Sequence, residues 1–333
     1  MKDKTITLAH GSGGRLTRDL IKDIILKYFN NPVLRRLEDS AEVTVRDRNI
    51  AFTTDSYVVN PIFFPGGDIG RLAICGTVND LAMKGAAPQF VSFSLIIEDG
   101  LALVDLEKIL RSAQKAARQA GITVVCGDTK VVEKGQADRI FITTSGIGAI
   151  KMKTGREFIR PGDRIILSGT VGDHGIAVLN ERLKLGLRSA LQSDSAPLNL
   201  ITEKLYKYSS AVRFMRDPTR GGLVSALSEA VDGLKLGMTI KEPAIPISRA
   251  VRGACAMLGL DPLYIANEGK FVAVVDPRRA AEILRAIKRH FLGRNAAVIG
   301  EVVKKPGGVW LETSIGGMRP LLPLAAEGLP RIC

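Results

Sequence analysis

The sequence predicts a two-domain protein in which both halves mix helices and strands, an α+β / α/β fold. Strand and helix signals alternate through the first half, and the alternation restarts near residues 160–163. With 333 residues, 46% of them hydrophobic, the chain has material for about two cores. We therefore expect one domain over 1–155, a second over 156–325 and a mobile tail over 326–333.

The elements of the first half are predicted from the spacing of apolar residues and from the breakers between them. Pro32 follows the first helix, Gly85 ends the second and Gly121 the third, and one strand runs directly into Asp55. In chain order the predicted elements are a helix over 15–29, a hairpin of strands 42–46 and 50–54, a helix over 71–83, a strand over 91–97, a helix over 103–120 and strands over 122–126 and 139–147.

The second half is predicted to begin with a strand and a glycine-rich loop. Its strands are connected too irregularly for a simple doubly wound sheet. In chain order the predicted elements are a strand over 164–168, a loop over 170–175, helices to about residue 231, strands near 263–266 and 271–275, a helix over 277–290 and strands over 296–303 and 308–313.

The composition argues against nucleic-acid and membrane functions. The net charge of +13 is scattered, without a run of five like charges, and one Trp and five Tyr offer few rings for base stacking. No apolar stretch approaches the length of about 20 residues that a membrane helix needs. Lys2, Asp3 and Lys4 do not lead into an apolar signal segment. We expect a cytoplasmic protein with neither nucleic acid nor membrane as a partner.

The four cysteines point to one reactive thiol. Cys75, Cys126 and Cys255 are expected in the core, and no C-x-x-C pair indicates a zinc site or a disulfide framework. Cys333 stands last, and chain termini are poorly ordered unless something holds them. A thiol on a mobile tail can enter an active site and leave it, as a covalent carrier requires. The alternative is that the chain simply stops at a cysteine.

Four aspartates are predicted where strands or helices meet loops. Magnesium prefers hard oxygen ligands and is often shared between a few carboxylates and nucleotide phosphates. Taken singly, each aspartate has an ordinary alternative role as a cap or turn residue. As a set they predict a magnesium site formed by Asp39, Asp55, Asp80 and Asp217.

Two glycine clusters each precede a predicted helix. In the second, Thr219 is expected to cap the helix, and Gly221 and Gly222 allow backbone amides to approach an anion at its positive end. The first is His10-Gly11-Ser12-Gly13-Gly14, for which an ordinary loop is the alternative. Neither cluster matches G-x-x-x-x-G-K-[ST], so a P-loop enzyme is excluded.

Three further residues are candidates for the chemistry. Lys130 follows Asp128 and Thr129 at the end of a strand, where it can neutralise a transferring phosphoryl group or lie on the surface. Glu268, between two apolar segments, is a candidate general base or a structural acid. His174 is one of three histidines and lies in a glycine-flanked segment that a helix cap would also explain.

Five motifs are distributed along the chain: TTDS at 53–56, CGTVNDLAM at 75–83, GDTKV at 127–131, RDPTRGGL at 216–223 and PRIC at 330–333. Together they resemble the HypE family of hydrogenase maturation factors, and the likeness runs from His10 to Cys333. The nucleotide motifs alone would indicate only the superfamily of aminoimidazole ribonucleotide synthetase and selenophosphate synthetase. The terminal cysteine narrows the resemblance.

The resemblance implies a PurM-like fold with an α/β first domain, whose strands form a barrel across a homodimer, and an α+β second domain. ATP is expected between the two domains. The implied Mg²⁺ ligands are the four aspartates named above. The residues assigned to the nucleotide are His10, Gly11, Ser12, Gly13, Asn79, Asp128, Thr129, Thr219, Gly221 and Gly222.

The reaction that the resemblance implies is the ATP-dependent dehydration of an S-carbamoyl group on Cys333 to a thiocyanate. The carbamoyltransferase HypF would load the thiol, and the HypC–HypD scaffold would receive the cyano group for the iron centre of [NiFe] hydrogenase. Phosphorylation by ATP turns the amide oxygen, a poor leaving group, into phosphate. Lys130 would stabilise the phosphate charge, and Glu268 or His174 would accept the nitrogen protons.

Two other functions fit the same motifs. A different ATP-dependent synthetase of this fold would make an amidine ring or selenophosphate, but the latter leads us to expect a reactive cysteine near the amino terminus, and none precedes Cys75. A non-catalytic nucleotide-binding carrier would merely present Cys333 to partners. Fold alone does not decide between them, because sites determine chemistry.

Overall fold

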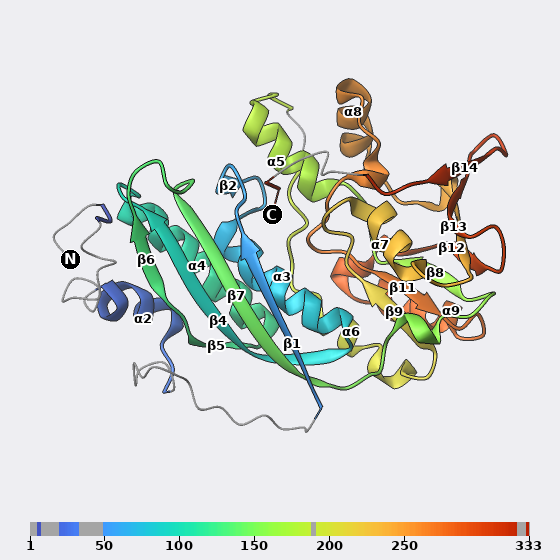
Figure 1. Cartoon of the computed structure of the whole chain (residues 1–333), viewed down its shortest axis with the longest axis horizontal. Coiled ribbons are helices and arrows are strands. Elements are labelled where there is room, and N and C mark those ends of the chain that lie inside the picture. Colours follow the sequence, from blue (N-terminus) through green and yellow to red (C-terminus); the bar gives the residue numbers. More distant parts are fainter. Residues whose placement is uncertain (1–4, 8–19, 33–48, 188–190, 325–330, 333) are drawn as a thin grey trace.

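A computed structural model of the chain describes residues 5–7, 20–32, 49–187, 191–324 and 331–332. Two sheets lie side by side, one built from the first half of the chain and one from the second (Figure 1). Both carry helices, so the predicted two-domain mixture of helix and sheet is confirmed. Within the described ranges, no helix is both long and apolar enough to cross a membrane.

The first sheet has the strand order β1-β7-β4-β5, and β6 also pairs with β4. Its strands, as far as the chain is described, are β1 (Ile50–Tyr57), β4 (Ala86–Glu98), β5 (Thr123–Cys126), β6 (Thr129–Val132) and β7 (Ile140–Ile150). β1 and β4 each run antiparallel to β7, whereas β5 and β6 are parallel to β4. Side chains alternate along β1, which directs Asp55 to one face and Phe52 to the other.

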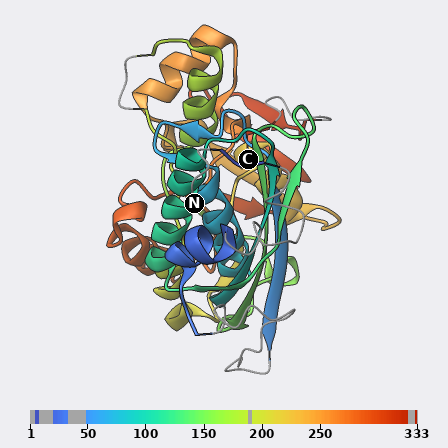
Figure 2. The same ribbon diagram turned by 90° about the vertical axis from the view of Figure 1, so that its left-hand side faces the viewer.

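Helices α3 (Ile69–Met83) and α4 (Leu103–Ala120) cover one face of this sheet (Figure 2). The Asp68 carboxylate caps α3 by accepting bonds from the amides of Gly70 and Arg71 at 2.8 and 3.0 Å. α4 spans the predicted residues and ends at Gly121, whose φ of 67° is the left-handed conformation of a helix C-cap. The opposite face of the sheet carries no helix among the described residues.

The second sheet has the strand order β14-β13-β10-β12-β8-β11-β9. Its strands are β8 (Arg164–Leu167), β9 (Val212–Arg216), β10 (Gly237–Lys241), β11 (Val272–Val275), β12 (Ala297–Val303), β13 (Gly308–Glu312) and β14 (Met318–Leu321). One face packs on α7 (Gly222–Val231), and the other on α6 (Asn199–Glu203) and α9 (Ala280–Lys288). Two further helices, α5 (Asp173–Leu183) and α8 (Arg249–Leu258), pack together at one end.

Several predicted elements need correction. The strand expected at 263–266 is wrong: a short 3-10 helix, η7 (Pro262–Tyr264), lies there, because Asp261 accepts a bond from the Leu263 amide and Pro262 lacks an N–H. The glycine loop ends earlier than predicted, since α5 begins at Asp173 and includes His174. Helices were expected throughout to residue 231, but β9 interrupts them.

Other differences concern elements that the sequence analysis missed or that are only partly described. β10, β14 and α8 were not predicted. The helix expected at 15–29 appears, in its described part, as the π-helical turn η2 (Ile21–Ile25) and α2 (Leu26–Phe29). The strand expected at 42–46 lies outside the described residues. Cys75 and Cys255 are buried as predicted, whereas Cys126 is only partly buried.

The two halves share their cores where they meet. Val178 of α5, Ala266 and Ile332 pack in the cluster of the first sheet. Conversely, Ala82 and Met83 of α3 pack in a cluster of the second. Helix α3 therefore contacts both halves, and residues at its carboxyl end lie at the junction.

Candidate active site

A cavity of about 1040 Å³ at this junction is lined by acids from separate elements. Asp55 comes from the helix-facing side of β1, Asp80 from the last turns of α3, and Asp217 follows the end of β9. Glu268 reaches the same cavity from the loop after η7. The structure thus brings together three of the four predicted metal ligands and the predicted base, from positions up to 213 residues apart.

Mutual repulsion and burial hold two of these carboxyl groups partly protonated near neutral pH. Burial, reinforced by the charge of Asp55, raises the pKa of Asp80 to about 6. Burial and the charge of Asp80 raise the pKa of Asp217 to about 7. The Thr53 hydroxyl donates to Asp80 at 2.7 Å, which offsets only part of this effect. The cavity therefore has an excess of negative charge that a cation would relieve.

Glu268 is the most deeply placed acid of the set. Its side chain is only 2% exposed, and its Oε1 is buried without a hydrogen-bond partner. Burial, with the charges of Asp217 and the other nearby acids, raises its pKa well above the ordinary value for a glutamate. A buried carboxyl with a raised pKa is, once ionised, a stronger base than an ordinary glutamate, and its free oxygen can then accept a proton from a bound group.

The donor set fits a magnesium ion that a ligand helps to hold. Carboxylate oxygens are the ligands this hard cation prefers, and it commonly takes one or two of them together with phosphate oxygens and water. In the part of the chain that the structure describes, no three His, Cys, Asp or Glu side chains form a ready-made metal group. Asp39 lies outside the described residues.

The entry to α7 is shaped by two glycines and not by a threonine cap. Gly221 is the N-cap with a φ of 69°, and no side chain caps the helix, so the predicted capping role of Thr219 is wrong. Gly222 has a φ of 62°, and a Cβ there would approach the carbonyl oxygens of Leu263 and Ile265 to 2.7 Å. Only glycine allows this close approach. Thr219 instead lines the cavity.

Asn79 lies behind the cavity and supports Glu268. Its Nδ2 donates to the backbone carbonyls of Glu268 and Ala196, each at 3.1 Å, and its Oδ1 accepts from the Leu198 amide at 2.8 Å. The side chain is 1% exposed. With its amide engaged in this way, Asn79 positions the loop that carries the buried acid.

Lys130 is not brought to the cavity within one chain. On β6 it pairs with Ile96 of β4, and both side chains lie on the face of the sheet opposite to α3. The Lys130 side chain is 65% exposed, and its Nζ lies 3.5 Å from Oδ2 of Asp128, whose side chain is 63% exposed. Thr129, the first residue of β6, is buried. Two strands, β7 and β4, separate β6 from β1.

His174 does not line this cavity and lies next to the end of the chain. It is fully buried in the first turn of α5, with Nδ1 2.8 Å from the Ser193 hydroxyl and Nε2 2.9 Å from the carbonyl oxygen of Ile332. Arg331 and Ile332 are the described part of the predicted tail. Cys333 and the loop residues His10, Gly11, Ser12 and Gly13 lie outside the described residues.

Sequence reasoning missed residues that the site uses. Tyr57 donates to Asp55 at 3.2 Å, and Arg216, the residue before Asp217, lines the cavity. The charge of Arg216 opposes the rise in the pKa of Asp217. Asp194 pairs with Lys270 at 3.2 Å, with both side chains almost fully buried. The position of Lys270, two residues after Glu268, could have marked it as a residue of the site. No local pattern marked Asp194.

Two family models match this chain. The AIR synthase related protein N-terminal domain matches residues 37–150, and the C-terminal domain of the same family matches residues 160–311. The carbamoyl dehydratase HypE of Rhizobium leguminosarum bv. viciae is 48% identical, covering 98% of this chain and 95% of the relative. The HypE of Escherichia coli (strain K12) is 44% identical, covering 98% and 99%.

Solved structures agree with these relatives. A hydrogenase maturation protein HypE in complex with ATP has a TM-score of 0.95 at 44% identity, covering 99% of this chain and 100% of that one. A HypE–HypF complex contains a chain with a TM-score of 0.81 at 44% identity, covering 92% and 99%. AaThiL complexed with AMPPCP and TMP, 20% identical with a TM-score of 0.65 and coverage of 96% and 99%, shares the fold. The predicted PurM-like two-domain fold is confirmed.

Proposed function

Because this chain belongs to the HypE family of carbamoyl dehydratases, we propose that it dehydrates an S-carbamoyl group on Cys333 to a thiocyanate with ATP. The product supplies the cyanide ligand for the iron centre of [NiFe] hydrogenase. ATP is bound by a HypE that resembles this chain over its whole length. We propose that the reaction takes place in the cytoplasm, the compartment that the sequence analysis predicts.

The chemistry requires two proton removals and one phosphoryl transfer. The amide oxygen of the S-carbamoyl group attacks the γ-phosphorus of ATP, the bond to ADP breaks, and one N–H proton leaves to give a phosphorylated imidate. Loss of the second N–H proton then forms the C≡N bond as the C–O bond to phosphate breaks. The balance is S-carbamoyl plus ATP giving thiocyanate, ADP and phosphate.

The observation that carries the proposal is the buried Glu268 carboxyl beside the acid cavity. Its Oε1 has no partner within the described protein, and its raised pKa makes it a strong base once ionised. We assign it the proton-accepting role. His174 is the weaker candidate, because both of its ring nitrogens already have partners.

Asp55, Asp80 and Asp217 would hold Mg²⁺, together with Asp39 from outside the described residues. The ion would neutralise phosphate charge during transfer. The raised pKa values of Asp80 and Asp217 are the expected consequence of acids assembled for a cation. The α7 entry at Gly221 and Gly222 would lie against the nucleotide phosphates, with the Gly221 amide and the Thr219 hydroxyl as donors. The Gly222 amide itself donates to the Thr219 carbonyl at 3.1 Å and so holds this turn.

The partners follow from the reaction. A carbamoyltransferase must load Cys333, and a HypE chain of this fold occurs in a complex with HypF. We propose HypF as the loading partner and the HypC–HypD scaffold as the acceptor of the cyano group.

A homodimer would cover the helix-free face of the first sheet. This face exposes Ile50, Phe52 and Ile96 by 46%, 69% and 40%, an unusual apolar content for a solvated sheet. Lys130 lies on the same face and pairs there with Asp128. Any contact of Lys130 with a transferring phosphoryl group would therefore come through the dimer.

The test separates loading from dehydration. The full chain is carbamoylated by HypF, freed of HypF and nucleotide, and then given Mg²⁺ with or without ATP. Intact mass should show loss of one water only with ATP, and neither loading nor water loss should occur in Cys333→Ala. Water loss without ATP would refute the mechanism.

Site variants distinguish the dehydratase from a passive carrier. Asp80→Asn and Glu268→Gln should load normally yet lose water at least about a hundredfold more slowly. Asp23→Asn, an exposed acid far from the cavity, is the control and should behave as the parent chain. A carrier without catalysis would show no difference among the three variants.

A further inference from the structure

The imidazole of His174 bridges the last described peptide of the chain and an internal segment. Its Nε2 lies 2.9 Å from the carbonyl oxygen of Ile332, the carbonyl that is bonded to the nitrogen of Cys333. Its Nδ1 lies 2.8 Å from the Ser193 hydroxyl. The Phe64 ring packs on it edge to face, with centroids 5.4 Å apart and planes at 88°. The two hydrogen bonds and this contact fix the orientation of the imidazole.

These contacts determine the tautomer. A carbonyl oxygen only accepts hydrogen bonds, so Nε2 must carry the proton. Burial lowers the pKa of His174, so the ring is neutral and Nδ1 is an acceptor. The Ser193 hydroxyl then donates to Nδ1, and its oxygen accepts from the Ser195 amide at 3.1 Å. Ser193 thus keeps the donor of His174 directed at the chain end.

The two described tail residues are held by more than this bond. The Arg331 carbonyl accepts from the Asn60 amide at 3.2 Å and from the Arg182 guanidinium. The Arg331 side chain pairs with Asp138. The Ile332 side chain is 4% exposed and packs in the core of the first sheet. The protein thus holds the segment through its backbone carbonyls, through the Arg331 side chain and through burial of the Ile332 side chain.

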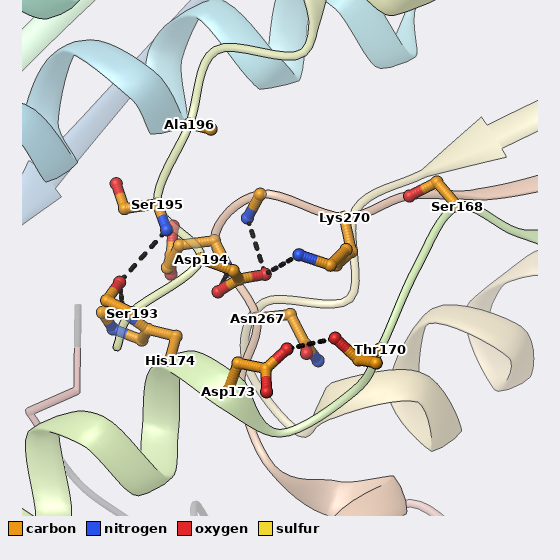
Figure 3. A network of polar contacts seen from close by, with 12 residues as sticks. Ser168, Thr170, Asp173, His174, Ser193, Asp194, Ser195, Ala196, Asn267 and Lys270 are labelled. Atoms are coloured by element: carbon orange, nitrogen blue, oxygen red, sulfur yellow. Dashed lines mark hydrogen bonds and ion pairs between the residues drawn. The ribbon is translucent and has the colours of Figure 1, made fainter. Parts of the chain in front are cut away.

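The segment that orients His174 also orients Glu268. Next to Ser193, the Asp194 carboxylate accepts from the amides of Glu268 and Gly269 at 3.0 and 3.1 Å and from the Lys270 ammonium at 3.2 Å. Figure 3 shows His174 at Ser193 on one side of this segment and Lys270 at Asp194 on the other. Burial by itself would raise the pKa of Asp194, but the charge of Lys270 and the bond from the Glu268 amide hold this pKa below its usual value. One stretch of chain therefore fixes both contacts.

We propose that His174, oriented by Ser193, is a positioning residue that holds the Ile332 carbonyl and so presents the terminal residue to the site at Glu268. The inference rests on the proposed function for its meaning, because a loaded thiol must be held in place during dehydration and released before and after it. A bond to the backbone carbonyl suits this use, since it does not depend on what the thiol carries.

The test is digestion of the full chain by carboxypeptidase Y, followed by intact mass. The peptidase must draw the last residues into its own site, so Arg331 and Ile332 have to leave their hydrogen bonds first. We expect His174→Ala to lose Cys333 about fivefold faster than the parent, the effect of one lost hydrogen bond. His174→Gln, whose Nε2 donates in a similar place, should digest at nearly the parent rate.

Controls separate tail release from a loosened fold. His290→Ala changes a histidine of the second half whose Nδ1 accepts from the Leu292 amide, and this variant should digest as the parent does. Cys75, fully buried, should stay unreactive to iodoacetamide in His174→Ala. An unchanged digestion rate, a failed Gln rescue, or alkylation of Cys75 together with faster digestion would overturn the proposal.

A second variant covers the case in which His174→Ala does not fold. Ser193→Ala leaves the ring in place but removes the donor to Nδ1, so digestion should be about twofold to fivefold faster. Parent-like digestion of Ser193→Ala would likewise overturn the proposal. The assay contains neither ATP nor a partner protein, so it reports on the tail even if the dehydratase activity were absent.

Discussion

The side-chain amide of Asn79 donates to the backbone carbonyl of Glu268, with 3.1 Å between Nδ2 and the oxygen. The two residues are 189 positions apart, one in a helix of the first half and one in a loop of the second. A second bond from the same amide reaches Ala196, and the Asn79 oxygen accepts from Leu198. Asn79 therefore joins the two halves directly behind the buried acid.

Asn79→Ala should lower the free energy of unfolding by about 1–3 kcal/mol, because it leaves buried backbone groups without partners. Dehydration should also slow, since the Glu268 loop loses its support. Urea unfolding and the intact-mass assay measure the two effects. Asn295→Ala, at an exposed position, should change stability by less than about 0.5 kcal/mol. Equal stabilities of the two variants would contradict this assignment.

The acid cavity should make the metal-free protein less stable as the pH rises. Folded Asp80 and Asp217 keep their protons up to about pH 6 and 7, whereas the unfolded chain releases them near 3.8. Between these values the native state binds more protons, so its stability falls with rising pH.

This effect is measured as Tm in EDTA from pH 5 to 8. Asp80→Asn should reduce the slope, because it removes one titrating group and lowers the pKa of Asp217. Mg²⁺ with ATP should raise the Tm most at the high-pH end. A parent and an Asp80→Asn variant with the same slope would exclude this account of the cavity.

Phe52→Glu should convert the proposed dimer to a monomer. The side chain is 69% exposed on the helix-free face of the first sheet, and a charge there would be desolvated between two copies. Light scattering coupled to size exclusion measures the mass. Phe291→Glu, at a 66% exposed position in the second half, should leave the mass unchanged. A monomeric parent chain would refute the proposed interface.

Gly222→Ala should destabilise the fold by about 1–3 kcal/mol from its φ of 62° alone, with the contacts to the carbonyls of Leu263 and Ile265 adding to this. Gly253→Ala is the matched control. It lies inside α8 with open space around its Cβ and should stabilise the chain by about 0.5–1 kcal/mol. Thermal unfolding measures the stability of both variants. A similar loss of stability in Gly222→Ala and Gly253→Ala would contradict the view that the backbone conformation at position 222 requires glycine.

Local patterns predicted the elements whose signals are complete within a few residues. α4 spans 103–120 as expected, because its apolar stripe and its terminal glycine lie within one segment. β10 and β14 were missed because each is a short strand whose stability comes from its neighbours in the sheet, β12 and β13. The apolar run at 263–266 was predicted as a strand. Pro262 and the cap residue Asp261 instead favour the short 3-10 helix η7.

The sequence by itself singled out the residues to which the family resemblance assigns the chemistry: the acids, Glu268 and the terminal cysteine. It did so because these residue types stand in short, recognisable motifs. Only the tertiary structure decided where the described residues among them lie. It put Asp55, Asp80, Asp217 and Glu268 on one cavity, left Lys130 on the opposite face of the sheet, and joined His174 to Ile332. The physical reason is that burial and hydrogen bonding between distant segments depend on how the two sheets pack, which no local pattern records.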